Sequence, residues 1–305
     1  MKKKYNKKKI LIIGKNGFFA KSFEKFFKDY DLKLIGREKD LSTINFKSVN
    51  IIINCAADIY NENEMFSSNT LLIYKILKNY LKQKSKAKII HFGSSGEYGK
   101  SDNIISEKNL PNPSSVYAGT KAAGTLILQA FSKQFKIPSV ILRSFTVYGP
   151  FENTSRILPF IFRHLLLNNK LTIYKGYHDY LYIDDLCKMI KKLINNWNIK
   201  NYGDIVNIGS GKQYSNKKIL EICENITKIK ASAKFSKKFN RSSHNKHYNY
   251  EIKENNPSKR RGLKLYSKTS LKNGIKKYWK NLLNNDDLRT HTMKYKNKFF
   301  TEWKN

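Results

Sequence analysis

A tyrosine and a lysine stand four residues apart in the stretch "PSSVYAGTKAAG", at Tyr117 and Lys121. On a helix this spacing places both side chains on one face, about one turn apart. A phenol with a pKa near ~10 is a weak acid–base group at neutral pH, but an adjacent ammonium group favours the phenolate and lowers that pKa. The pair could therefore exchange a proton with a substrate oxygen, whereas a solvated helix face is the ordinary alternative.

Two further features could complete a hydride-transfer site with this pair. Ser94 lies at the end of the apolar stretch "IIHFGSS", and functional groups gather at the carboxyl ends of parallel strands. Gly14 and Gly17 stand between the apolar run "ILII" and a predicted helix. Glycines in this position let the backbone approach a pyrophosphate at the helix N-terminus, so we expect a bound dinucleotide.

The residues after the second predicted strand bear on which dinucleotide binds. The sequence reads "LIGREKD", with Arg37 followed by Glu38. An acidic residue there accepts the ribose 2′-OH of NAD, and an arginine accommodates the 2′-phosphate of NADP. Arg37 slightly favours NADP, NAD is the alternative, and an exposed surface arginine is the interpretation without function.

The elements that would position these residues alternate along the chain. After a first strand in "KKILIIG", apolar runs predict buried strands over residues 32–36, 49–57, 87–95 and 138–145. Helices are predicted over residues 18–29, 66–82 and 117–135. This alternation, with strands that lack polar alternation, predicts an α/β fold with a Rossmann-type doubly wound parallel sheet.

Past residue 150 the pattern loosens and predicts a smaller C-terminal α/β lobe that binds substrate. Helices are expected over 156–167, 185–195 and 216–226, and strands over 171–176 and 204–211. We expect residues 1–150, with 178–208 returning to them, to form an NAD(P)-binding domain. Residues 151–177 and 209–284 would form the substrate lobe, and 285–305 a tail.

Composition narrows the classes of partner. The formal charge is +36, but lysine is spread from Lys2 to Lys304, which is typical of a solvated surface. We therefore expect no nucleic-acid partner, although the charge would attract a phosphorylated ligand. Three scattered cysteines predict reduced thiols and no metal site. Without an apolar run long enough for a membrane helix or a secretory leader, we expect a cytoplasmic protein.

Several motifs occur together in one order: "GKNGFFA", "NCAA", "HFGSSGEYG", "YAGTK", "LRSFTVYGP", "HDYLYIDDL", "VNIGSG" and "GLKLYSKTSLKNGIKKY". Their ordered set resembles the extended short-chain dehydrogenase/reductases, the nucleotide-sugar epimerase/dehydratase family. The resemblance implies a Rossmann lobe that binds NAD(P), a second lobe that binds a nucleoside-diphosphate sugar, and a homodimer. His178 departs from the family, because an arginine is frequent at its position.

The resemblance also implies roles for particular residues. Tyr117 would be the acid–base residue, Lys121 would orient the cofactor ribose and tune Tyr117, and Ser94 would hydrogen-bond the reacting sugar oxygen. The implied cofactor-binding residues are Gly14, Asn16, Gly17, Phe18, Arg37, Ala56, Ala57, Tyr117 and Lys121. The implied substrate-binding residues are Ser95, Thr146, Arg143 and Arg260.

The residues that follow Ser94 narrow the choice among the reactions of the family. The family's 4,6-dehydratases have an acidic residue and a glutamate directly after the catalytic hydroxyl, where this chain has Ser95 and Gly96; Glu97 comes one residue later. A dehydratase is therefore disfavoured. We expect a 4-keto-sugar reductase, narrowly ahead of a 4-epimerase, with a non-catalytic dinucleotide- or RNA-binding module as the distant alternative.

Overall fold

The computed structural model describes residues 7–99, 105–199, 202–236 and 267–294. Its main sheet has six strands in the order β2-β1-β3-β4-β5-β9, and every neighbouring pair is parallel. The strands are β1 (Lys9–Ile13), β2 (Asp31–Ile35), β3 (Ile51–Asn54), β4 (Lys88–Ser94), β5 (Ser139–Ser144) and β9 (Asp204–Ile208). The strand order reverses direction at β1, so the loops after β1 and β3 border a crevice in which such sheets bind ligands.

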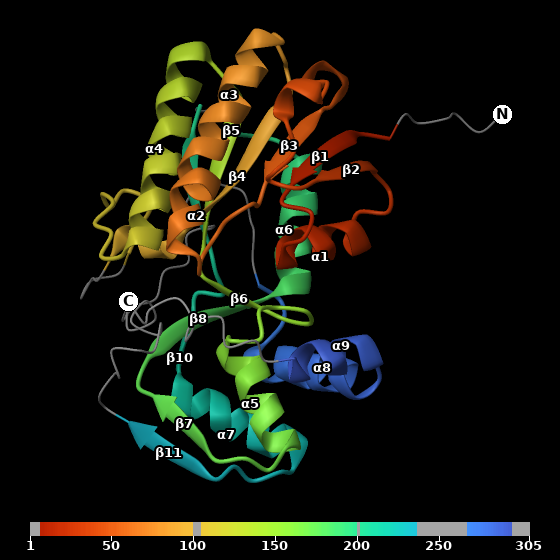
Figure 1. Cartoon of the computed structure of the whole chain (residues 1–305), viewed down its shortest axis with the longest axis vertical. Coiled ribbons are helices and arrows are strands. Elements are labelled where there is room, and N and C mark those ends of the chain that lie inside the picture. Colours follow the sequence, from red (N-terminus) through yellow and green to blue (C-terminus); the bar gives the residue numbers. More distant parts are fainter. Residues whose placement is uncertain (1–6, 100–104, 200–201, 237–266, 295–305) are drawn as a thin grey trace, which may run out of the picture.

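Helices cover both faces of this sheet, as Figure 1 shows. One face carries α1 (Phe18–Phe26) and α6 (Ile183–Asn195), and the other carries α3 (Leu72–Lys82) and α4 (Val116–Phe135). A short helix α2 (Glu62–Phe66) and a π-helical turn η3 (Ser67–Leu71) lead directly into α3. The predicted doubly wound α/β fold is confirmed.

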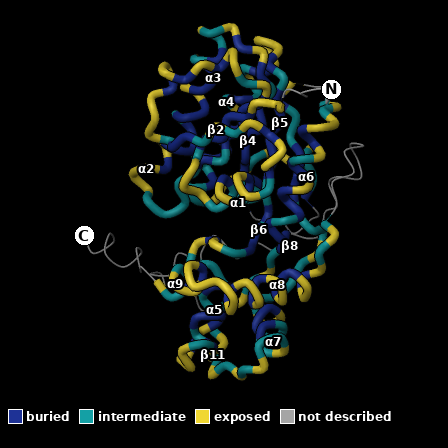
Figure 2. Tube along the Cα trace, turned by 90° about the vertical axis from the view of Figure 1, so that its right-hand side faces the viewer, coloured by how far each residue is buried: buried dark blue, intermediate teal, exposed yellow. Residues whose placement is uncertain are grey.

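The central strands are buried on both faces, which is why their sequences are continuous apolar runs. Residues 10–13 of β1 and 51–54 of β3 are all buried. Figure 2 shows this pattern along the trace, with buried strands inside and exposed segments on the outer turns. The short 3-10 turns η1 (Leu41–Thr43), η2 (Phe46–Ser48) and η4 (Ser95–Tyr98) lie in the connections.

The second lobe is assembled from short strands and helices at the carboxyl end of the main sheet. A three-stranded sheet has the order β10-β8-β6, and β7 pairs with β11 in parallel. The strands are β6 (Thr146–Tyr148), β7 (Leu171–Tyr174), β8 (Tyr177–Tyr182), β10 (Gln213–Ser215) and β11 (Ala233–Ser236). The helices are α5 (Ile157–Leu166), α7 (Asn216–Thr227), α8 (Leu271–Leu283) and α9 (Asp286–Met293).

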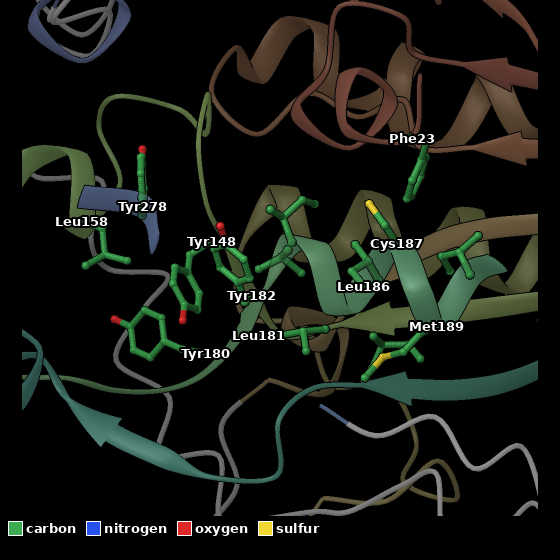
Figure 3. Close-up of a cluster of buried hydrophobic side chains, with 14 of the residues drawn as sticks. Phe23, Tyr148, Leu158, Tyr180, Leu181, Tyr182, Leu186, Cys187, Met189 and Tyr278 are labelled. Atoms are coloured by element: carbon green, nitrogen blue, oxygen red, sulfur yellow. The ribbon is translucent and has the colours of Figure 1, made fainter. Parts of the chain in front are cut away.

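One hydrophobic core joins the two lobes. Figure 3 shows buried side chains that run from Phe23 on α1, past Leu186 and Cys187 on α6, to Tyr148 and Tyr278 in the second lobe. Helix α6 follows β8 without a loop, so the chain that leaves the small sheet packs at once on the large one. The lobes therefore share apolar side chains as well as a boundary.

Part of the predicted C-terminal tail is helical. Residues 286–293 form helix α9, whose Leu288 is 1% exposed and whose Thr292 is fully buried. The sequence signal was weak, because the apolar residues of this helix are few and its surroundings are charged. Residues 295–305 of the predicted tail lie outside the described residues. Within the described ranges, no helix is both long and apolar enough to cross a membrane.

Candidate active site

A cleft lies between the carboxyl ends of the main strands and the second lobe. Its lining on the sheet side includes Gly17, Phe18, Ala57, Ser94, Ser95, Tyr117 and Lys121. On the opposite side its lining includes Thr146, Glu152, Asn153, Arg156, His178 and Asp179. The structure therefore gathers the predicted catalytic residues, together with several predicted cofactor and substrate residues, around one space.

The glycine loop closes tightly between β1 and α1. Gly14 has φ of +108°, and a Cβ added to it would lie 2.8 Å from the backbone nitrogen of Ala56. Gly14 N also donates to Ile35 O at 2.9 Å, and Gly17 N donates to Gly14 O at 2.8 Å. Only glycine combines this backbone conformation with so close an approach. The loop thereby brings the N-terminus of α1 to the cleft, where Gly17 and Phe18 line it.

The N-terminus of α1 has the character of an anion site. No side chain caps it, and no acidic residue lies in its first turn. Its first backbone N–H groups and its positive dipole end face the region in which a dinucleotide's pyrophosphate binds in this type of fold. Asn16 is exposed on the same loop, and Ala56 is buried against Gly14.

Arg37 and Glu38 occupy the tip of β2 with opposite charges. The Arg37 guanidinium lies 2.9 Å from the Asp58 carboxylate and also donates to Ala57 O at 3.5 Å. The Glu38 carboxylate folds back over Gly36, so a Cβ on Gly36 would lie within 1.9 Å of it. Arg37 is thus already paired, and an acidic group stands beside it at the strand end.

Ser94 ends β4 and begins the 3-10 turn η4. Its Oγ accepts a hydrogen bond from Gly96 N at 3.1 Å, and its own backbone N–H donates to Glu97 Oε1 at 2.7 Å. The two bonds form a capping box, which fixes the direction in which the chain leaves the strand. Ser94 is partly buried and faces the cleft beside Ser95.

Tyr117 and Lys121 stand one turn apart on α4, and both line the cleft. Lys121 is 2% exposed, and its Nζ donates to Phe92 O on β4. Burial lowers the pKa of Lys121 from 10.5 to about 8, while the nearby negative charge of Glu97 acts in the opposite direction. The ammonium group therefore sits in a poorly hydrated place close to the strand that carries Ser94.

The π-helical turn η3 fixes the position of α4 along its axis beside this site. Asn69 donates to Thr120 Oγ1 at 3.0 Å, and Thr70 Oγ1 donates to Thr120 O at 2.8 Å. Gly124 permits this approach, because a Cβ there would lie 2.3 Å from Asn69 O. Thr120 directly precedes Lys121, so these bonds hold the lysine in register with β4.

Cys55 lies close to the lysine but has no nucleophilic character. Its thiol donates to Ile13 O at 3.3 Å, and burial raises the pKa of Cys55 to about 12. The thiol therefore stays protonated at neutral pH and behaves as a small packed side chain.

One predicted substrate residue does not line the cleft, and another lies outside the described residues. Arg143 is fully buried, with its Nε 2.7 Å from Glu97 Oε2. Sequence reasoning placed it correctly at the strand end but could not show that its side chain points into the protein. Arg260 lies outside the described residues.

The opposite wall of the cleft contains residues that sequence reasoning did not select. Glu152 is 2% exposed, and burial raises its pKa from 4.5 to about 8. Arg156 Nε lies 3.8 Å from Glu152 Oε2. Burial and the charge of Arg156 lower the pKa of His178 to about 3, so this histidine is neutral. The sequence signal that could have found this site is the pair of opposite charges at Glu152 and Arg156, four residues apart in "ENTSR".

This pair changes the interpretation of His178. An arginine is frequent at position 178 in the family, and in this chain Arg156 supplies a cation on the same wall. The two positions are 22 residues apart in sequence, so no local pattern connects them.

The loop that carries Glu152 is held by the second lobe's C-terminal helix. His291 Nε2 on α9 donates to Glu152 O at 2.9 Å. Arg163 on α5 donates to Thr154 O at 3.3 Å and to Thr292 O at 3.5 Å. Helix α9 thereby supports one wall of the cleft.

Comparison with known proteins places this site in a family. The sequence model of the "NAD dependent epimerase/dehydratase family" matches residues 36–209, which is more than half of the chain. The chain belongs to the NAD-dependent epimerase/dehydratase family. The predicted membership in the extended short-chain dehydrogenase/reductases is confirmed.

Relatives within the family have different activities. A dTDP-D-glucose 4,6-dehydratase of Dictyostelium discoideum is 27% identical over 254 residues, which cover 74% of this chain and 57% of the relative. A putative UDP-glucose 4-epimerase of Methanocaldococcus jannaschii is 30% identical over 220 residues, covering 66% and 69% of the two chains. The chain thus spans little more than half the length of the first of these relatives.

Solved structures of the family share the fold. A UDP-glucuronic acid 4-epimerase from Bacillus cereus, solved with UDP-glucuronic acid and NAD, superposes with a TM-score of 0.77 at 23% identity. The match covers 90% of this chain and 99% of the epimerase. A dTDP-glucose 4,6-dehydratase from Bacillus anthracis gives the same TM-score at 17% identity, covering 92% and 98% of the two chains.

Proposed function

We propose that this protein is a nucleotide-sugar oxidoreductase that moves a hydride at a sugar carbon, with Tyr117 as the acid–base residue. The observation that carries the proposal is the convergence of Ser94, Tyr117 and Lys121 on one cleft beside the glycine loop. These residues come from two different elements, and a chance YxxxK pair on a solvated helix would not bring its lysine to 2% exposure against β4.

The chain's own residues suit a dinucleotide. The strained, close-packed Gly14 turn leaves the backbone open to a pyrophosphate, and the uncapped N-terminus of α1 supplies donors for it. When bound, the nicotinamide ring would accept hydride from the sugar carbon or return it. Lys121 would hold the adjacent ribose through its ammonium group.

Proton transfer falls to the helix and strand that line the cleft. Tyr117 would take the proton from the sugar hydroxyl as the hydride leaves, or give one back to the new alkoxide when the hydride returns. Ser94 would hydrogen-bond the same oxygen and keep it in line with the phenol. The Lys121 ammonium would favour the phenolate form of Tyr117 by charge attraction.

The β2 tip supports NAD as the dinucleotide. Arg37 is engaged with Asp58 at 2.9 Å, and Glu38 follows it at the end of β2, where an acidic residue would accept the ribose 2′-OH. The sequence argument for NADP rested on the presence of Arg37 at this tip, and the pairing of Arg37 with Asp58 weakens that argument. Arg37 is still 36% exposed through its side chain, so NADP stays as the second candidate.

The reaction that fits these features is 4-epimerisation, in which the hydride leaves one face of the sugar carbon and returns to the other. Such a cycle regenerates its dinucleotide and suits NAD. Water elimination is disfavoured, because Ser95 and Gly96 follow Ser94 and Glu97 is fully buried in its ion pair. A 4-keto-sugar reductase is the second candidate, supported by the exposed Arg37 at the β2 tip.

The substrate would be a nucleoside-diphosphate sugar placed between the two walls. Ser95 and Thr146 would contact its sugar, and the cation at Arg156 would face its negative end. The strongly positive chain would attract a doubly charged diphosphate over a distance.

The first experiment is to denature the purified protein and identify any released dinucleotide by mass. Near-stoichiometric NAD would support the epimerase. A protein that carries no dinucleotide and binds NADPH more tightly than NADH would support the reductase instead. Binding of neither would contradict both enzymatic proposals. Arg37→Ala is the matched variant: under the NAD proposal it leaves NADH affinity within about threefold, whereas an NADP enzyme would lose most of its NADPH affinity.

A further inference from the structure

A fully buried carboxylate stands directly behind the serine at the end of β4. Glu97 Oε1 accepts the backbone N–H of Ser94 at 2.7 Å, and Glu97 Oε2 accepts Arg143 Nε at 2.7 Å. Both side chains of this ion pair are 0% exposed. Gly93 makes room for the carboxylate, because a Cβ there would lie 2.6 Å from Glu97 Oε1.

The ion pair ties three strand ends together. The Arg143 guanidinium on β5 lies 4.3 Å from the centre of the Tyr98 ring. Tyr98 in turn donates to Asn207 Oδ1 on β9 at 2.7 Å. The position of Ser94 is therefore set from the strands on its far side as well as by its own turn.

The same carboxylate acts on the lysine of α4. Burial lowers the pKa of Lys121, and Glu97 is the largest opposing influence. The other titratable groups that act on or near Lys121 are Cys55, which stays protonated, His91, which burial and the charge of Lys121 keep neutral, and Tyr117, which stands one turn away on α4. Glu97 is thus the negative charge that acts most strongly on this ammonium group.

A buried ion pair is weak evidence for stability. The desolvation of two charges can exceed their attraction, and well-packed apolar residues often stabilise the same site equally well. Stability alone therefore does not explain why a glutamate and an arginine are paired here, with the glutamate bonded to the backbone of Ser94.

We propose that Glu97 is a positioning residue: it fixes the backbone of Ser94 and places a negative charge next to Lys121. The inference rests on the proposed roles of Ser94 and Lys121. It assigns Glu97 a function different from that of the acidic residues used by dehydratases, because its carboxylate faces the interior and never meets the substrate.

Two variants separate the two parts of the role. Glu97→Gln keeps an oxygen acceptor for Ser94 N but removes the charge that raises the pKa of Lys121, so the alkaline limit of kcat moves to a pH below that of the wild-type protein. Glu97→Val with Arg143→Met removes acceptor and ion pair together without leaving a buried charge. It keeps the wild-type melting temperature within a few degrees, while kcat falls by roughly tenfold or more and KM changes little.

Asp185→Asn is the matched control. Asp185 is another buried carboxylate, 2% exposed, and it accepts hydrogen bonds from Lys268 N and Thr269 N far from Ser94. This variant loses stability without moving the pH limit. The positioning role is wrong if the double variant keeps the wild-type kcat as well as the wild-type stability. It is also wrong if Glu97→Gln leaves the alkaline limit of kcat unchanged.

A readout without turnover separates this inference from the proposed function. Amide hydrogen exchange of the Ser94 N–H is measured in the wild-type protein and in the double variant, which loses protection if Glu97 holds that amide. Equal protection in both overturns the inference. If the wild-type protein binds no dinucleotide and turns over no nucleotide sugar, the proposed function fails, and the exchange experiment still decides whether Glu97 fixes Ser94.

Discussion

The sheet-side wall of the cleft consists of strand ends and one long helix, whereas the opposite wall is mainly the loop between β6 and α5. On the first wall, Ser94 N and Arg143 Nε both lie 2.7 Å from the Glu97 carboxylate. On the second wall, Arg156 Nε stays 3.8 Å from Glu152 Oε2. Each wall thus buries one glutamate, but only one of them has a close cationic partner.

The difference follows from the backbone that carries each glutamate. Glu97 stands on a capping box at the end of a central strand, so neighbouring strands bring its partners to it. Glu152 follows Phe151, a bulky residue with φ of +67°, in a loop whose support comes from α9. Such a conformation is strained for phenylalanine and persists because the surroundings impose it. The first wall is held mainly by its own strand ends, whereas the second depends on contacts from a distant helix.

The largest effect is expected at Tyr117, on the sheet-side wall of the cleft. Tyr117→Phe removes the proton-transfer group without changing the packing of the ring, so kcat falls by roughly 10²–10⁴-fold. Dinucleotide affinity stays within a few-fold of wild type in an equilibrium binding assay. Tyr202→Phe on the surface, where the tyrosine is 41% exposed, is the control. Near-normal turnover by Tyr117→Phe would remove this residue from the acid–base role.

A smaller effect is expected at the glycine loop. Gly14→Ala places a Cβ 2.8 Å from Ala56 N in a backbone with φ of +108°. The loop must shift, so dinucleotide affinity falls by roughly tenfold or more, and the free energy of unfolding falls by about 1–3 kcal/mol.

Gly119→Ala on α4 is the matched control for that change. A Cβ at Gly119 meets nothing within 4 Å. Alanine is the better helix former by about 1 kcal/mol, so this variant gains stability and keeps its affinity. Both quantities are measured by urea unfolding and dinucleotide titration. Equal behaviour of the two alanine variants would show that the Gly14 turn is not a close-packed phosphate loop.

The smallest effect is expected at Glu152 on the opposite wall, and it appears only as a change of stability with pH. Because the pKa of Glu152 is raised from 4.5 to about 8, the folded state favours its protonated form. Stability from this group is complete below pH 4.5 and is lost as the pH rises toward about 8, by at most on the order of 5 kcal/mol. Glu152→Gln removes this loss.

The measurement is urea unfolding of both proteins between pH 5 and about 7, a window that ends below the pKa of about 8 of Lys121. The wild-type protein should lose stability relative to Glu152→Gln as the pH rises. Arg156 and the neutral His178 face this carboxyl in both proteins, so their contributions largely cancel in the difference. Parallel pH profiles would mean that Glu152 is ionised in the folded state, and the two walls would then differ less than their geometry indicates.

Local sequence patterns determined the half of this protein that contains the six-stranded sheet. The apolar runs at β1, β3, β4 and β5 predicted buried parallel strands, and the four-residue spacing of Tyr117 and Lys121 placed both on one helical face. The glycine loop was visible because a tight turn before a helix requires glycine at fixed places. In each case the residues that define the feature lie within a few positions of each other in the sequence.

Only the tertiary structure decided the rest. Whether Arg143 faces the cleft or Glu97 depends on how β5 packs beside β4 and the turn that follows it, because Arg143 and Glu97 are 46 positions apart in sequence. The support of the Glu152 loop by His291 spans 139 positions, and α9 itself carries too little apolar periodicity to predict. Propensity and spacing act over a few residues, whereas burial and ion pairing depend on which distant segments share one space, and that is set when the two lobes pack around their common core.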